Sequence, residues 1–124
     1  MYKRQEYAAE KQQYPIDRFT LETKRQLDVL NNQLANNKYI CGEDYTIADV
    51  ASFPWYAGLV LGTVYTNANI FLNAEKDYPH VIRWAKEISE RPAVKRGKVV
   101  NKTWGDGKQL KERHGAEDLD KLGL

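Results

Sequence analysis

The stretch Tyr45-Thr46-Ile47-Ala48-Asp49-Val50 decides how the middle of this chain folds. Thr46 is a candidate helix N-cap, and Asp49 follows three positions later. The Thr46 hydroxyl can therefore accept a hydrogen bond from the Asp49 amide, while the Asp49 carboxylate accepts one from the Thr46 amide. This capping box predicts a helix start at Thr46. It gives Asp49 a structural role, whose loss should cost about 1–2 kcal/mol.

The segment after the box, Val50–Leu61, is apolar on nearly every side. A helix of this kind is typical of the centre of a helical bundle. Its first amides would then have no access to water, so we expect the capping box to matter more than usual here. Pro54 removes one backbone hydrogen bond and predicts a kink.

Helices are predicted on both sides of this segment. Upstream, one stripe recurs at three- and four-residue steps up to Asn36-Asn37 and consists of Ile16, Phe19, Thr20, Thr23, Leu27, Leu30 and Leu34. Leu21 and Val29 widen this stripe and predict packing on two sides. Downstream, Pro79 lies in the first turn of a helix with Val81, Trp84, Ala85 and Ile88 on one face, and Pro92 begins a short helix to Val100.

The remaining segments are polar or irregular. Residues 1–13 are interpreted as a frayed helix, 38–45 as a loop in which Gly42 can take a positive φ, and 62–77 as a connection. Residues 102–124 form a polar tail, at best partly helical around 109–113. We therefore predict an all-α fold, a bundle of four to five helices over residues 1–101, followed by this tail.

Composition excludes several classes of protein. The chain has 124 residues with 42% hydrophobic side chains, which suits one compact domain and excludes a disordered chain. A net charge of +2 is too balanced to argue for a nucleic-acid or membrane partner from bulk charge alone. The apolar run 50–65 is too short to span a bilayer. A single cysteine excludes a disulfide framework and fits a cytoplasmic location.

Few side chains are candidates for chemistry. Ser52 and Ser89, His80 and His114, and Cys41 form no recognisable nucleophile–base pair, and we interpret them as packing or surface residues. No metal-ligand spacing and no glycine-rich phosphate loop is present. The aromatic run Phe53, Trp55 and Tyr56 fits either core packing or the wall of a ligand pocket. We assign no catalytic residue and no metal site.

Basic side chains are concentrated near the C-terminus. Residues 91–113 hold eight Lys or Arg against two acidic residues. A solvated surface is the simpler interpretation. The functional alternative is an anion site, for a carboxylate-bearing small molecule or a nucleic acid.

Taken in order, these motifs resemble the C-terminal helical domain of glutathione S-transferases. The resemblance covers about residues 14–101 and rests on the capping box, Pro54-Trp55, Tyr78-Pro79-His80 and Glu90-Arg91-Pro92-Ala93-Val94. The stretches Ile16-Asp17-Arg18-Phe19, 24–30 and 96–101 are similar to the bacterial Nu-class group, the YghU-type disulfide-bond oxidoreductases.

The resemblance implies a two-domain, dimeric, glutathione-using enzyme. Its thiolate-activating groups belong to a thioredoxin-like domain that matches nothing in this sequence, so we expect the chain to be inactive alone and to bind glutathione weakly or not at all. Arg18 corresponds to an arginine that contacts glutathione, although a surface salt bridge is an equal alternative. Trp55 and Tyr56 would lie near the same cleft on the substrate side.

Two other functions stay open. One is a stand-alone, non-catalytic helical module that binds proteins. The other, the weakest alternative, is a nucleic-acid binder that uses residues 91–113. For both the glutathione-linked protein and the module, we expect a homodimer through the helix at residues 15–36 or through the truncated N-terminal helix, because a bare apolar face usually finds a partner.

Overall fold

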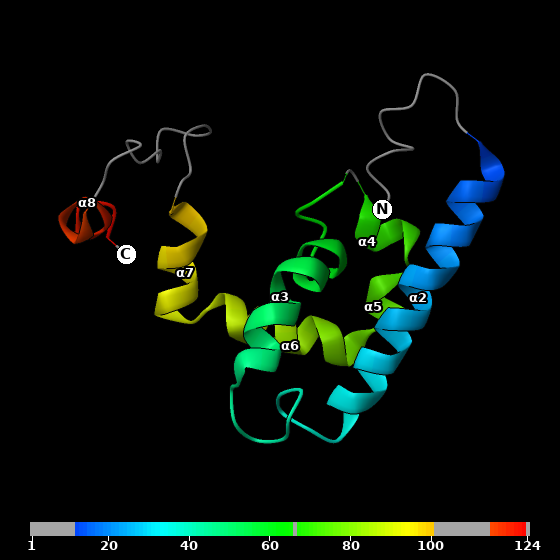
Figure 1. The fold of residues 1–124 in the computed structure, drawn as a ribbon, viewed down its shortest axis with the longest axis horizontal. Helices are drawn as coiled ribbons and strands as arrows, with labels where there is room; N and C mark the ends of the chain where they lie inside the picture. The colour runs from blue at the N-terminus through cyan, green and yellow to red at the C-terminus, as the bar shows by residue number, and fades with distance from the viewer. Residues whose placement is uncertain (1–11, 66, 101–114, 124) are drawn as a thin grey trace. The chain divides into compact units, whose positions relative to one another are not determined.

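The computed structural model describes residues 12–65, 67–100 and 115–123, and its regular secondary structure there is helical (Figure 1). The helices are α2 (Gln13–Ala35), α3 (Ile47–Val60), α4 (Ala68–Phe71), α5 (Ala74–Asp77), α6 (Pro79–Ser89), α7 (Pro92–Val99) and α8 (Ala116–Asp120). Within these ranges the only β-type pairing is an isolated bridge between Tyr39 and Gly42. The predicted all-α class is confirmed.

The predicted helices correspond to α2, α3, α6 and α7. Three short helices were not predicted. The connection at 62–77 contains the single-turn helices α4 and α5, and the tail contains α8. The helical turn expected around 109–113, and all but the last two residues of the frayed helix expected at 1–13, lie outside the described residues. By its contacts the chain separates into two compact units, Met1–Lys86 and Glu87–Leu124. The expected division between 101 and 102 stays a prediction.

The core of the first unit is formed by one face of each long helix. Its buried side chains are Leu27, Leu30 and Leu34 of α2, Phe53, Ala57 and Val60 of α3, and Val81, Trp84 and Ala85 of α6. The rings of Phe53 and Trp84 meet edge to face, with centroids 6.0 Å apart. This arrangement adds a directional contact to the burial of two large apolar groups.

The expectation that the central helix lies in the middle of the bundle holds for one face only. Ile47, Val50 and Trp55 of α3 are 83%, 52% and 76% exposed. The packing on two sides expected for α2 is not found either, because Leu21 and Val29 are 66% and 61% exposed. Periodicity reports which side chains are apolar. It does not report how many neighbouring elements the chain has to cover them.

The buried carboxylate of Asp49 connects three parts of the first unit. Its Oδ1 accepts hydrogen bonds from the Ile40 amide (3.0 Å) and from the Trp84 indole N–H (2.9 Å). Its Oδ2 accepts from the Thr46 amide (3.0 Å), and the Thr46 hydroxyl in turn accepts from the Ala48 amide (3.3 Å). The capping box is therefore present. The same carboxylate also bonds the Ile40 amide in the 36–46 loop and the Trp84 indole of α6. The capping box alone does not imply these two bonds.

These bonds also set the protonation of Asp49. Burial by itself raises the pKa of Asp49. The hydrogen bonds from the Ile40 and Thr46 amides, the Trp84 indole and the Thr46 hydroxyl (3.3 Å to Oδ2) outweigh it and leave this pKa below its ordinary value. A lowered folded-state pKa stabilises the fold at pH values above the unfolded pKa of about 3.9. That stabilisation is lost as the pH falls through the folded value.

The start of α6 is capped by a side chain of α2, and the end of α2 is capped by a side chain of α6. Pro79 has no N–H, and the next two amides of α6, those of His80 and Val81, donate to Asn31 Oδ1 of α2 at 3.0 and 3.3 Å. Conversely, the Arg83 guanidinium of α6 donates to the carbonyls of Leu34 (3.0 Å), Asn37 (2.9 Å) and Lys38 (3.2 Å) at the end of α2. A cation there also opposes the negative end of the helix dipole.

A glycine ends α3. Gly62 has φ +68, the Thr63 amide donates to the Gly58 carbonyl (3.0 Å), and the Gly62 amide donates to Leu59 (3.4 Å). This pattern is a Schellman motif, in which glycine takes the left-handed position without steric cost. It turns the chain directly into the segment that carries α4 and α5.

We expect Asp49→Ala to lower the free energy of unfolding by at least about 3 kcal/mol, more than the 1–2 kcal/mol of a cap, because it leaves the Trp84 indole and the Ile40 amide without their acceptor. The matched control is Thr46→Ala, which removes only the hydroxyl of the box and should cost about 1 kcal/mol. Urea denaturation followed by circular dichroism measures both. Equal losses in the two variants would contradict the wider role of Asp49.

Candidate functional site

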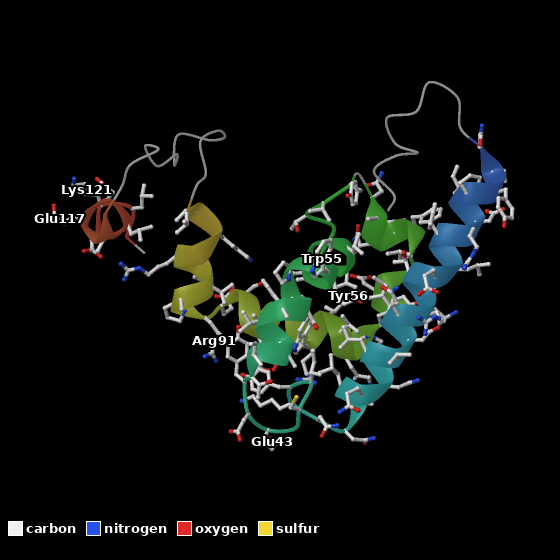
Figure 2. All side chains as sticks on the ribbon, in the orientation of Figure 1. Glu43, Trp55, Tyr56, Arg91, Glu117 and Lys121 are labelled. Atoms are coloured by element: carbon white, nitrogen blue, oxygen red, sulfur yellow. The ribbon has the colours of Figure 1, made fainter. Side chains whose placement is uncertain are left out.

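The three residues expected to bind ligand occupy different positions on α2 and α3. Arg18 is exposed on the N-terminal part of α2. Trp55 and Tyr56 are neighbours on α3, where Trp55 is exposed and Tyr56 is half-buried (Figure 2). The core-packing interpretation of Trp55 is therefore wrong, whereas Tyr56 packs in part. Phe53 is a core residue.

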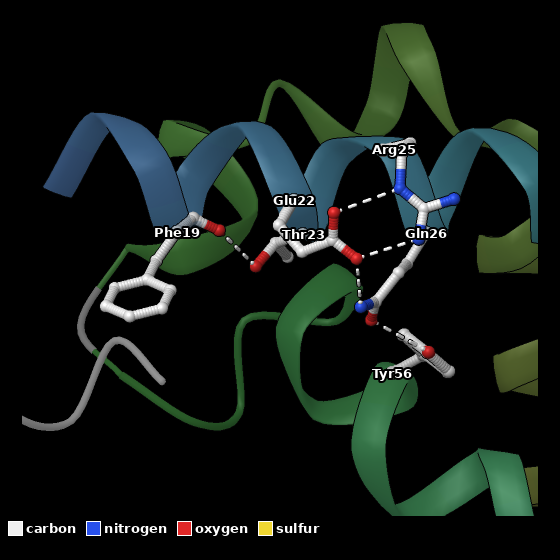
Figure 3. A network of polar contacts seen from close by, with 6 residues as sticks. All are labelled: Phe19, Glu22, Thr23, Arg25, Gln26 and Tyr56. Carbon is white, nitrogen blue, oxygen red and sulfur yellow. Dashed lines mark hydrogen bonds and ion pairs between the residues drawn. The ribbon is translucent and has the colours of Figure 1, made fainter. Parts of the chain in front are cut away.

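Tyr56 is connected to α2 by a row of polar side chains (Figure 3). Its hydroxyl donates to Gln26 Oε1 (3.1 Å), and Gln26 Nε2 donates to Glu22 Oε1 (2.8 Å). Glu22 also accepts two hydrogen bonds from Arg25, from Nε (2.9 Å) and from a terminal nitrogen (2.8 Å). The forked guanidinium holds both carboxylate oxygens, and this restricts the conformation of the whole row.

The charges in this row stabilise each other. The hydrogen bond from Arg25, followed by that from Gln26, lowers the pKa of Glu22 to about 2. The positive charge of Arg18, one helical turn away, acts in the same direction. The bond to Glu22 raises the pKa of Arg25 in return. Glu22 is thus ionised throughout the physiological pH range, and its carboxylate is occupied by Arg25 and Gln26.

Arg18, Glu22 and Gln26 follow each other at four-residue steps on α2, and Tyr56 of α3 is bonded to the last of them. Arg18 lies two turns before Gln26, a distance of about 12 Å along the helix axis. Neither Arg18 nor Trp55 forms a hydrogen bond or an ion pair with another described residue. Both are therefore available to a ligand or to a further part of a protein. An unpaired guanidinium is suited to bind a carboxylate in bidentate fashion.

The sequence analysis did not identify Glu22, Arg25 or Gln26 as parts of this region. Their spacing of three and four residues on one helix was the available signal, since such pairs face each other. The contact of Gln26 with Tyr56 had no signal, because the two residues are 30 positions apart.

The other side chains considered as catalytic candidates form no common site among the described residues. Cys41 is exposed, Ser52 and His80 are half-buried, and His114 lies outside the described residues. In the described ranges no group of three or more His, Cys, Asp or Glu is placed to hold a metal ion. None of the described helices has the length and apolar character needed to cross a bilayer.

The described part of the basic stretch is largely engaged by local partners. Lys95 pairs with Glu90 (2.6 Å), Arg96 with Asp120 (3.5 Å), and Lys98 donates to the Ser89 hydroxyl (3.3 Å). The four basic residues at 102–113 lie outside the described residues. These pairs support the interpretation of a solvated surface over that of a nucleic-acid site.

We expect the Glu22 carboxylate to titrate at about pH 2 in the wild-type chain. Arg25→Met should raise this midpoint furthest, because it removes the largest cause of the lowered pKa, and Gln26→Leu should raise it less. Arg18→Met, which removes only a through-space charge, is the control with the smallest rise. Side-chain carbon NMR of Glu22 against pH measures all four. An unchanged midpoint in Arg25→Met would contradict the bidentate pair.

Comparison with known proteins identifies the relatives of this fold. The sequence model of the glutathione S-transferase C-terminal domain matches residues 2–92. The disulfide-bond oxidoreductase YghU of Escherichia coli (strain K12) is 56% identical over 115 residues, which cover 92% of this chain and 39% of that protein. The disulfide-bond oxidoreductase YfcG of the same organism is 39% identical over 81 residues, with 65% and 34% covered.

A solved structure agrees with these matches. The glutathione transferase YghU from Streptococcus pneumoniae, in complex with glutathione, superimposes with a TM-score of 0.70 at 54% identity, over 73% of this chain and 34% of that one. The chain thus spans between 34% and 39% of the length of these relatives. The resemblance found in the sequence is confirmed, and the chain belongs to the glutathione S-transferase C-terminal domain family.

Proposed function

We propose that this chain supplies the helical, substrate-side half of a glutathione-dependent disulfide reductase or transferase. The observation that carries the proposal is the 56% identity to the disulfide-bond oxidoreductase YghU over 92% of this chain. Because the chain spans 39% of that protein, the thiolate-activating groups are expected on a separate thioredoxin-like domain. The chain by itself is then inactive, and none of its own residues is catalytic.

In this proposal Arg18 binds a carboxylate of glutathione, and Trp55 and Tyr56 border the cleft. Glutathione carries two carboxylates, and Arg18 has no ion-pair partner among the described residues. The neighbouring carboxylate that would compete for Arg18, Glu22, is already held by Arg25 and Gln26. This pairing keeps the Arg18 guanidinium available to an anion from outside the helix.

The energetics explain why a second domain is needed. One charge-assisted hydrogen bond stabilises a complex by about 1.5–3 kcal/mol. The loss of translational and rotational freedom on association opposes it by about 4 kcal/mol or more. Arg18 alone therefore yields an affinity for glutathione no better than about millimolar. Productive binding requires the further contacts of a thioredoxin-like domain.

We expect calorimetry to detect glutathione or glutathione disulfide binding at millimolar affinity at best with this chain alone. When the chain is joined to the N-terminal part of the Escherichia coli YghU protein, disulfide reduction by glutathione should appear. Arg18→Ala should reduce this activity about 10-fold or more, as the loss of a charge-assisted bond implies.

Two controls make this experiment specific. Arg18→Lys keeps the charge without the fork and should retain part of the activity, and Lys24→Ala on the same helix should leave it unchanged. Micromolar glutathione binding by the chain alone would contradict the proposal. A joined protein that folds, binds glutathione and does not reduce disulfides would favour the alternative, a non-catalytic protein-binding module.

We also propose that the chain forms a homodimer through α2, in a cytoplasmic setting that suits its single cysteine. The exposed apolar side chains of Leu21 and Val29 lie on that helix eight residues apart, and so on one face. We expect Leu21→Glu to convert the dimer to a monomer in light scattering at micromolar concentration. Ile70→Glu, an equally exposed apolar position on α4, is the matched control that should stay dimeric. A monomeric wild-type chain would contradict the proposal.

A further inference from the structure

The row of side chains between Tyr56 and α2 has a fixed hydrogen-bond direction (Figure 3). It starts at Glu22, whose carboxylate accepts from Arg25 Nε (2.9 Å) and from a terminal nitrogen of Arg25 (2.8 Å). Because the pKa of Glu22 is lowered to about 2, this carboxylate is ionised at neutral pH and can only accept hydrogen bonds. Every group that bonds to Glu22 must therefore donate.

Glu22 in turn sets the orientation of the Gln26 amide. Gln26 Nε2 donates to Glu22 Oε1 at 2.8 Å, so Gln26 Oε1 is the atom that faces the Tyr56 hydroxyl at 3.1 Å. If the amide were turned over, its oxygen would lie against the charged carboxylate oxygen, and the repulsion between two acceptors disfavours that orientation. The Tyr56 hydroxyl therefore donates its single proton to Gln26.

The direction of this row determines what Tyr56 can offer to a ligand. A phenol has one O–H donor, and its oxygen also accepts hydrogen bonds. Gln26 occupies the donor, and no other group of the described residues bonds to the Tyr56 hydroxyl. Tyr56 is half-buried and follows the exposed Trp55 on α3. Toward a ligand its oxygen is therefore an acceptor, which pairs with a donor.

We infer that Tyr56 is a specificity-determining residue that accepts a hydrogen bond from the disulfide substrate, and that Glu22 and Gln26 are the positioning residues that impose this role. The inference rests on the proposed function, in which Tyr56 borders the cleft. It favours disulfides that carry an O–H or N–H group near the sulfur atoms over disulfides that carry only acceptors. Tyr56 has no free proton to give to a departing thiolate, so it acts in binding and not as an acid.

The test joins the complete 124-residue chain to the N-terminal part of the Escherichia coli YghU protein and compares two neutral substrates, bis(hydroxyethyl) disulfide and bis(methoxyethyl) disulfide. The methyl groups of the second compound remove the O–H donors and keep the oxygens. Tyr56→Phe should lower kcat/KM for the hydroxyl compound about 3- to 10-fold, the effect of one neutral hydrogen bond, and leave that for the methoxy compound unchanged.

A positioning variant separates this role from a merely structural one. Gln26→Leu frees the Tyr56 proton, so the hydroxyl can donate to the methoxy oxygen, and kcat/KM for the methoxy compound should rise relative to that for the hydroxyl compound. In the Tyr56→Phe background, Gln26→Leu should no longer change this ratio. Gln13→Leu, at an exposed glutamine of the same helix outside the row, is the matched control and should leave the ratio unchanged.

A second measurement needs no activity. In the 124-residue chain alone, Tyr56→Phe should shift the carbon NMR resonance of the Gln26 side-chain carbonyl, because it removes the bond that this oxygen accepts. An unshifted resonance overturns the inference. So does a joined protein that reduces both disulfides and in which Tyr56→Phe slows both equally or neither. A joined protein that folds and reduces neither disulfide contradicts the proposed function, and this inference with it.

Discussion

The fold of the first unit depends on one buried carboxylate. Asp49 accepts hydrogen bonds from the start of its own helix at Thr46, from the preceding loop at Ile40 and from the indole of Trp84 in the core. A carboxylate can be buried at this position because each of its oxygens has donors of its own. The same bonds keep it ionised, so its charge and its position support each other.

At other helix ends in this unit, backbone groups also form hydrogen bonds with side chains from another helix. Asn31 of α2 caps the start of α6, and Arg83 of α6 caps the end of α2, so each helix provides hydrogen-bond partners that the other cannot provide for itself. The two helices are therefore joined by polar bonds in addition to the burial of Leu27, Leu30, Val81 and Trp84 in the core. Removing either helix would expose backbone groups of the other.

Apolar side chains of α2 and α3 are exposed as well as buried. Leu21, Val29, Ile47 and Trp55 are all more than half exposed, although their helices also contribute the core. The chain spans 39% of the related YghU protein. The proposed homodimer through α2 would cover Leu21 and Val29.

The sequence by itself determined the helical class, the family and most helix ends. Thr46 with Asp49, Pro79 and Pro92 are local signals, because a cap or a missing N–H acts within one turn of the backbone. The short helices α4, α5 and α8 were not predicted, because they have no comparably strong local signal. Arg18, Trp55 and Tyr56 were selected by resemblance, and sequence reasoning did not foresee that Glu22 and Gln26 connect Tyr56 to α2.

Only the tertiary structure decided which faces are covered and which polar groups meet. The bonds from Trp84 to Asp49, from His80 to Asn31 and from Arg83 to Leu34 join residues 35, 49 and 49 positions apart. No local pattern encodes such pairs, since they form only when packing brings two helices together. Burial likewise depends on the neighbours a helix finds, so a mostly apolar segment such as α3 can have one buried face and one exposed face.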